Sequence, residues 1–231
     1  MAYQNSPKIV TNGLVLCLDA GNTKSYPGTG TAWYDLYKSG YNGTLYNGIG
    51  FSSANSGSLT FDGTNDYLYV TNSTNTNIGT GNWSQNVWVK FNSTANQRIT
   101  IKRFGGLGYG YSLYISSGAV GFEILTPSTY IIINGSSIST GVWYNFCVTL
   151  NRSGSGILYI NGIQNSTADY SSFNGLDITN SYPLTLGAVD PAIVSGAYLN
   201  GNIAIVQNYN KLLTSLEVLQ NYNATKSRFG L

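Results

Sequence analysis

Short runs in which hydrophobic and polar residues alternate recur along most of this chain. The run NWSQNVWVKF places four apolar side chains on one face of a predicted strand: Trp83, Val87, Val89 and Phe91. The run WYNFCVTLN does the same with Tyr144, Phe146, Val148 and Leu150. Because successive side chains of a strand point to opposite faces, each run predicts a strand with one buried face.

Turn signals separate these runs from one another. Other strand-like runs are GLVLCLD, SLTFDG, DYLYVT, QRITIKR, YSLYISS, AVGFEIL, TYIIIN, GILYING, PLTLGAV and NGNIAIVQNY. Asn-Gly and Asp-Gly pairs tolerate the positive φ of tight hairpin turns. The predicted turns begin at Asn42, Asn47, Asp62, Asn134, Asn161 and Asn200. About a dozen short strands punctuated in this way predict an all-β fold, a two-sheet antiparallel sandwich or a barrel.

One segment near the C-terminus, NKLLTSLEVLQNY, predicts a short helix instead. Thr214 is a favourable N-cap, and Glu217 three residues later completes a capping box. Leu213 and Val218 are placed to form a hydrophobic staple. Because a helix of about ten residues is marginal alone in water, we expect it to dock on the sandwich. The predicted docking face consists of Leu216, Leu219 and Tyr222.

The composition is poor in charge and rich in small polar residues and tyrosine. Charged residues make up 9% of the 231 residues, and the formal net charge is +2; an average domain has roughly 25% charged residues. The clustered cations are Lys102 with Arg103, and Lys226 with Arg228. Neither pair forms a stripe that follows a phosphate backbone, so we expect no nucleic-acid partner.

The cysteine and histidine counts limit the chemistry. There is no histidine, which removes the usual general base and the commonest zinc ligand. Cys17 and Cys147 both lie in apolar strand-like runs, where two buried free thiols are expected; a disulfide between them is the alternative. No signal peptide is apparent, and no apolar run approaches the roughly 18–20 residues of a membrane span. Synthesis in a cytoplasm is expected, without membrane insertion.

A set of segments in fixed order resembles a known fold family. The segments are FDGTNDYLYV, VWYNFCVTL, LYINGIQ, LTLGA and GNIAIVQNYNKLLTSLEVLQNYNATKSRFG. They resemble the concanavalin A-like, laminin G-like jelly-roll domain, in the version found in structural proteins of tailed phages. The opening GLVLCLDAGNTKSYPGTGTAWYDL is similar to those phage proteins as well. We therefore expect one jelly-roll domain over residues 13–231, with residues 1–12 as an arm that anchors to a partner.

Aromatic residues beside a glycine-rich loop are candidates for sugar binding. The segment RFGGLGYGYSLYI offers Phe104, Tyr109, Tyr111 and Tyr114, whose rings are suited to stack on pyranose faces. The alternative is that tyrosine simply suits strands and half-buried surfaces.

The carboxylates suggest two further kinds of site, a calcium site and a catalytic pair. The resemblance implies a candidate calcium site at Asp62 and Asp66, because some relatives bind Ca²⁺ with carboxylates and carbonyls. The alternative is an Asx-turn, in which Asp62 bonds its own backbone. A glycoside hydrolase needs two carboxylates flanking the scissile bond. None of the nine acids lie two apart on a predicted strand, so we expect no catalytic residues.

The resemblance implies a non-enzymatic structural protein of a virus particle: a capsid decoration, neck, tail or fibre component. Its partners would be other virion proteins, in a homo-oligomeric or multi-protein assembly, together with host-surface glycans. It would be made in the host cytoplasm and end in the virion. The alternatives are a carbohydrate-binding, lectin-like adhesin and a glycoside hydrolase.

Overall fold

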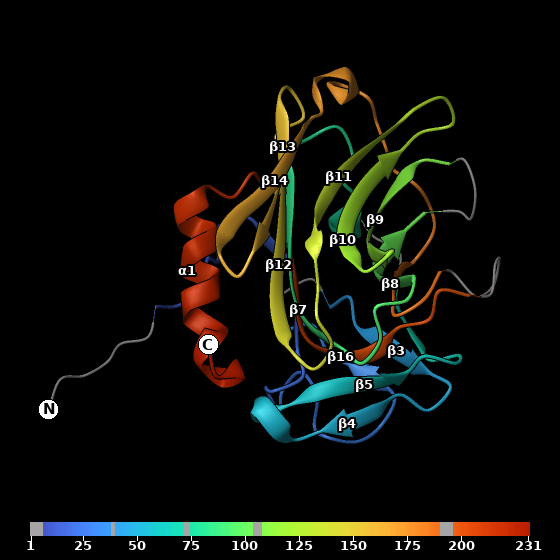
Figure 1. Ribbon diagram of the computed structural model, residues 1–231, viewed down its shortest axis with the longest axis vertical. Helices are drawn as coiled ribbons and strands as arrows, with labels where there is room; N and C mark the ends of the chain where they lie inside the picture. The colour runs from blue at the N-terminus through green and yellow to red at the C-terminus, as the bar shows by residue number, and fades with distance from the viewer. Residues whose placement is uncertain (1–6, 38–39, 72–73, 104–107, 190–195) are drawn as a thin grey trace, which may run out of the picture.

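Two antiparallel β-sheets pack face to face in the computed structural model, with one short helix near the C-terminus (Figure 1). The structure describes residues 7–37, 40–71, 74–103, 108–189 and 196–231. The two antiparallel sheets confirm the predicted all-β sandwich.

The first sheet, sheet A, is built around the long strand β16. Its order is β14 (Ile163–Asp169), β13 (Ser155–Ile160), β12 (Trp143–Leu150), β7 (Trp83–Phe91), β16 (Asn200–Tyr209), β5 (Ser58–Asp62) and β4 (Gly50–Ser52). The strand β1 (Leu14–Asp19) also pairs with β16, so β1 and β5 share its second edge. The first and last strands of the chain are therefore neighbours.

The second sheet, sheet B, closes the other side of the core. Its order is β11 (Tyr130–Ser137), β10 (Ala119–Leu125), β9 (Gly110–Ser116), β8 (Gln97–Lys102), β15 (Leu184–Leu186), β6 (Tyr67–Val70), β3 (Gly43–Tyr46) and β2 (Ala32–Trp33). Four 3₁₀ turns complete the described elements: Ala54–Ser56, Thr74–Thr76, Ser171–Phe173 and Lys226–Phe229.

The predicted alternation places the core correctly. Trp83, Val87, Val89 and Phe91 are all buried in the main core between the sheets, as are Phe146, Val148 and Leu150, with Tyr144 packed against them. The turn predictions hold at three of six sites: Asn47 and Asn161 adopt φ of 64° and 52°, and Gly63 after Asp62 adopts 81°.

The other three predicted turns are wrong. Gly43 and Gly135 lie within β3 and β11, and Gly201 lies within β16. A Cβ on Gly201 would come within 2.1 Å of the Lys90 carbonyl oxygen. The glycine at position 201 therefore allows the two strands to pack closely and does not form a turn.

Much of the outer face of sheet A is covered by other parts of the chain. Two small apolar clusters lie on it, one around Cys17, Cys147 and Val218, the other around Trp88 and Phe229. Cys17 and Cys147 are buried free thiols, as predicted. Burial raises the pKa of the Cys17 thiol to about 12, which keeps it protonated and unreactive.

A row of amide side chains also crosses this face. Asn145 Nδ2 donates to Asn86 Oδ1 at 2.9 Å, and Asn86 Nδ2 donates to Gln207 Oε1 at 3.0 Å. Gln207 Nε2 reaches the Cys17 sulfur at 3.9 Å. These bonds link the side chains across β12, β7, β16 and β1 and compensate for most of the cost of burying them.

The helix α1 (Ser215–Thr225) lies against this outer face (Figure 1). The predicted capping box is confirmed: Glu217 N donates to Thr214 Oγ1, and Thr214 N donates to Glu217 Oε2. Leu213 and Val218 pack in one cluster, as the staple predicts. The predicted docking face is confirmed at Tyr222, whose ring stacks on Trp88 with centroids 5.8 Å apart. It is wrong at Leu216, which is 77% exposed, and Leu219 is 40% exposed.

The buried residues of α1 are Val218 and Asn221. Asn221 Oδ1 accepts from Val10 N at 2.8 Å, and Asn221 Nδ2 donates to the Tyr209 hydroxyl at 3.0 Å. Gln220 Nε2 donates to the Lys8 carbonyl oxygen. The described part of the predicted arm thus runs along α1; residues 1–6 lie outside the described residues. Among the described helices, none is long and apolar enough to span a lipid bilayer.

Candidate functional site

The three described members of the predicted sugar-binding set, Tyr109, Tyr111 and Tyr114, do not form one surface. Phe104 lies outside the described residues. Tyr109, which is 44% exposed, lies just before β9. Tyr111 and Tyr114 are three positions apart on β9 and therefore point to opposite faces of sheet B.

Tyr111 is a core residue, which corrects its assignment to a binding surface. It is 1% exposed, its ring lies 4.8 Å from that of Trp83, and its hydroxyl donates to the Thr76 carbonyl oxygen at 2.8 Å. A ligand cannot reach it without opening the sandwich.

Tyr114 lies on the outer face of sheet B and lines a pocket there together with Arg98 and Glu123. Tyr114 itself is 9% exposed, so its ring forms part of the pocket wall rather than a projecting platform.

The Asp62–Asp66 segment forms the turn that was the alternative to a calcium site. Asp62 Oδ1 accepts from Thr64 N at 2.7 Å, which is an Asx-turn, and Asp66 Oδ2 accepts from Asp62 N at 3.0 Å. Asp66 is buried, and desolvation raises its pKa. Within the described residues, no group of three or more acidic, cysteine or histidine side chains is placed to hold a metal ion.

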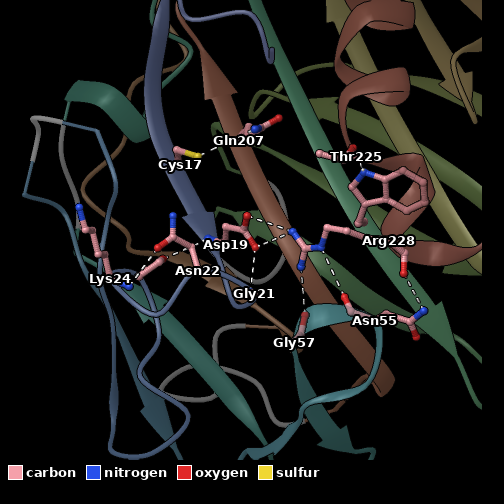
Figure 2. Close-up of polar contacts among 12 residues, drawn as sticks. Cys17, Asp19, Gly21, Asn22, Lys24, Asn55, Gly57, Gln207, Thr225 and Arg228 are labelled. Atoms are coloured by element: carbon pink, nitrogen blue, oxygen red, sulfur yellow. Dashed lines mark hydrogen bonds and ion pairs between the residues drawn. The ribbon is translucent and has the colours of Figure 1, made fainter. Parts of the chain in front are cut away.

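Other carboxylates are engaged in structural contacts. Asp19 accepts two hydrogen bonds from Arg228 Nη1, at 2.8 and 3.0 Å (Figure 2). The Arg228 guanidinium also donates to the carbonyl oxygens of Asn55 and Gly57, at 3.4 and 3.3 Å. We call Asp19, Asn55, Gly57 and Arg228 the C-terminal latch. It joins β1 to the last residues of the chain, so these charges hold the fold together.

A cluster of three tyrosines on sheet B was missed by the sequence prediction. Tyr46 on β3 stacks on Tyr67 of β6, with ring centroids 4.8 Å apart and planes 11° apart. Tyr69 lies 4.8 Å from Tyr67 and 5.4 Å from Tyr46. We call Tyr46, Tyr67 and Tyr69 the tyrosine platform.

The platform lies on the outer face of sheet B. Its strands alternate these tyrosines with the core residues Leu45, Leu68 and Val70, so the platform side chains point away from the core. Tyr46 is 38% exposed, and Tyr67 and Tyr69 are half-buried. The spacing of Tyr67 and Tyr69 was visible in the run DYLYV, whereas the pairing of Tyr46 with Tyr67 depends on strand register.

The same face holds a group of charges around β8, β9 and β10. Glu123 on β10 accepts from Arg98 Nη1 at 3.4 Å and from Arg103 Nη2 at 3.0 Å. The Arg98 guanidinium carbon lies 4.7 Å from the Tyr114 ring centroid, a cation–π distance. Sheet B therefore presents aromatic and charged side chains outward, while α1 and the segments beside it cover much of sheet A.

Comparison with known proteins agrees with this architecture. The sequence profile of the concanavalin A-like lectin/glucanases superfamily matches residues 61–219. No curated protein sequence matches the chain significantly.

Several solved structures share the fold. The binding domain of Paraclostridial Mosquitocidal Protein 1 has a TM-score of 0.72 at 17% identity, covering 92% of this chain and 52% of that one. The binding domain of botulinum neurotoxin DC, solved in complex with SialylT, has a TM-score of 0.69 at 18% identity over 92% and 52%. Domain 4 of AbnA, a GH43 extracellular arabinanase from Geobacillus stearothermophilus, solved in complex with arabinotriose, has a TM-score of 0.69 at 16% identity over 90% and 98%.

This chain thus spans about half the length of the two toxin structures and nearly all of the arabinanase domain. At these identities the likeness concerns the fold alone.

Proposed function

Because this chain belongs to the concanavalin A-like lectin/glucanases superfamily, we propose that it is a non-enzymatic, carbohydrate-binding module. The glycan binds on the outer face of sheet B, where the tyrosine platform provides the stacking surface. The platform is the observation that carries this proposal. A cluster of rings on paired strands presents contact area with little side-chain entropy to lose.

The chemistry of sugars fits such a surface. The C–H groups on one face of a pyranose or furanose ring form an apolar patch that packs on an aromatic ring, while its hydroxyls bond to nearby polar groups. Hydroxyl, amide and guanidinium groups lie on or near the same sheet. The two solved complexes named above, with SialylT and with arabinotriose, support a ligand of this class.

The carboxylates described above support binding rather than hydrolysis. Glu123 is held by two arginines, Asp19 is in the latch, and Asp66 is buried. A hydrolase needs two carboxyl groups about 5–9.5 Å apart that both face the substrate.

A glycan array followed by calorimetry on the sugars that bind tests the proposal. The Tyr46→Ala variant should weaken binding about tenfold, which corresponds to ~1.4 kcal/mol, because it removes the most exposed ring of the platform. Tyr130→Ala is the matched control: Tyr130 is 61% exposed and lies on β11, at the other end of sheet B. A folded protein that binds no glycan on the array, or equal losses in the two variants, would refute the proposal.

A second role, as a virion structural component, rests on the likeness of the opening and closing segments to tailed-phage structural proteins. In that role the module sits on the particle, contacts other virion proteins and adheres to host-surface glycans. Purified particles that contain the chain at a fixed stoichiometry would support this role. Its presence only in infected-cell extracts would count against it.

A further inference from the structure

A broad pocket lies on the outer face of sheet A, beside the start of α1. Its volume is about 530 Å³, and it is bordered by β12, β13 and β14 on one side and by the segment before α1 on the other. Strand register places Thr149 beside Ile157, and Tyr159 beside Gln164, so these four side chains share one face of the sheet. The pocket is therefore formed by segments that are distant in the sequence.

Both walls of this pocket are held by hydrogen bonds within the chain. Ser84 Oγ on β7 accepts from Leu213 N at 3.0 Å and donates to the Lys211 carbonyl oxygen at 2.9 Å. These bonds fix the segment before α1 against sheet A. On the other side, Asn151 N donates to the Ser155 carbonyl oxygen at 3.2 Å across the turn between β12 and β13. The pocket is thus already formed without a ligand, as small-molecule sites usually are.

Three polar side chains that line the pocket keep hydrogen-bonding groups that the described chain does not use. Asn151 Oδ1 accepts from Ser153 N and from Ser153 Oγ, at 3.2 and 3.0 Å. The Nδ2 group of Asn151 has no partner among the described residues. The side chains of Ser155 and Gln164 are exposed, and neither makes a hydrogen bond within the described part of the chain. An amide nitrogen, a hydroxyl and a whole amide therefore remain available to a ligand.

The described residues that line this pocket include no charged side chain. Ile157, Leu212 and Leu213 supply an aliphatic part of the wall. Lys211 and Glu217 are close to these residues in the sequence, but they pair with each other at 2.6 Å and do not line the pocket. A charged ligand would lose hydration here without gaining an opposite charge, and a hydrocarbon ligand would leave the amides without a partner. The lining therefore favours a neutral ligand that is both polar and apolar.

We propose that this pocket is a second carbohydrate site, which binds a short neutral sugar through Asn151, Ser155 and Gln164. A sugar ring combines an apolar face with a rim of hydroxyl groups, and the pocket combines aliphatic side chains with unused amide and hydroxyl groups. Its volume lies within the range of about 300 to 1,000 Å³ that is typical of small-ligand pockets. The inference goes beyond the proposed function, because it adds a site on the opposite face of the sandwich from the tyrosine platform.

The two sites recognise a sugar by different means. The platform offers rings for stacking, whereas the pocket encloses its ligand and forms hydrogen bonds with it. Because they lie on opposite faces, a glycan of one or two rings occupies only one of them at a time. The test therefore needs a measurement that reports on each site separately.

NMR titration of the backbone amide signals with lactose and with arabinotriose provides this measurement. The signals of Asn151, Ser155 and Gln164 should shift and saturate as either sugar is added. Galactose should bind at these residues at least fivefold more tightly than galacturonate, because no cation in the pocket compensates for the lost hydration of the carboxylate.

The Gln164→Trp variant fills the pocket and should weaken lactose binding, followed at Asn151, at least tenfold. Ile163→Trp is the matched control, because Ile163 is 72% exposed, does not line the pocket and precedes Gln164 on the opposite face of β14. It should change the affinity less than twofold. If Gln164→Trp does not fold, Gln164→Ala removes only an exposed amide. It should weaken binding about threefold, while its thermal midpoint stays within about 2 °C of the wild type.

The outcomes separate this inference from the proposed function. Shifts at the tyrosine platform without shifts at Asn151, Ser155 and Gln164, or equal affinities of Gln164→Trp and Ile163→Trp, would overturn the second site alone. Shifts at the pocket without any at the platform would support the second site and contradict the placement of the first. If no sugar shifts any amide signal, both proposals are wrong.

Discussion

Breaking the C-terminal latch should destabilise the whole sandwich, because the latch joins the first strand to the last residues of the chain. The change that we would make is Asp19→Asn, which removes the charge and keeps the shape of the side chain. Arg228 would then lose its charged partner, although its bonds to the carbonyl oxygens of Asn55 and Gly57 would remain. The side chains of Arg228 and Asp19 are only 18% and 22% exposed, so water replaces the lost contact poorly.

The expected cost follows from the geometry. Hydrogen bonds to charged groups contribute about 1.5–3 kcal/mol each, while an exposed ion pair contributes roughly 0.2–1 kcal/mol. The Asp19–Arg228 contact has two short bonds and is largely, but not fully, removed from water. We therefore expect Asp19→Asn to lower the free energy of unfolding by about 2 kcal/mol.

Urea unfolding measures this cost. Trp88 stacks on Phe229 with ring centroids 4.0 Å apart, so its fluorescence reports on the C-terminal segment. A double-mutant cycle with Arg228→Met isolates the pair, and its coupling energy should be about 1.5 kcal/mol. Lys24→Met, at an exposed cation, is the control and should change stability by less than about 0.5 kcal/mol. A coupling energy near zero, or one that vanishes in high salt, would refute the reasoning.

Two further predictions concern buried cations. Arg152→Met removes hydrogen bonds of 2.7–3.0 Å to the carbonyl oxygens of Gly79, Phe173 and Leu176. It should lower the free energy of unfolding by about 3 kcal/mol in the same urea assay; an unchanged midpoint would contradict this. Burial lowers the pKa of Lys102 to about 7, so above that pH the unfolded chain holds this proton more tightly than the native one. Stability should therefore rise from about pH 7 to 8.5, and Lys102→Met should remove this rise.

Much of the fold could be predicted because it depends on local pattern. Period-2 alternation assigned the core faces of β7 and β12 correctly, and the N-cap chemistry of Thr214 placed the start of α1. The same alternation also separates Tyr111 from Tyr114, since three positions along a strand reverse the face. Treating both tyrosines as one surface was therefore an error that the sequence pattern itself contradicts.

Other features depend on contacts between distant segments. Leu216 looked like a docking residue because the helix face was chosen by apolar spacing, yet Asn221 is buried through bonds to Val10 and Tyr209. The burial of Asn221 can be explained only when its hydrogen-bond partners, which are distant in the sequence, are known. Likewise, the tyrosine platform requires the pairing of β3 with β6, and nothing local to Tyr46 indicates that partner.

The two faces of the sandwich differ in what covers them, and this difference favours placing the binding function on sheet B. Much of the outer face of sheet A is occupied by α1, the amide row and the residues beside the latch, all supplied by this chain. A short helix, marginal alone, is stabilised there by tertiary contacts. Sheet B has the tyrosine platform on its outer face. Of the two outer faces, the one that carries the tyrosine platform is therefore suited to stack on a sugar ring.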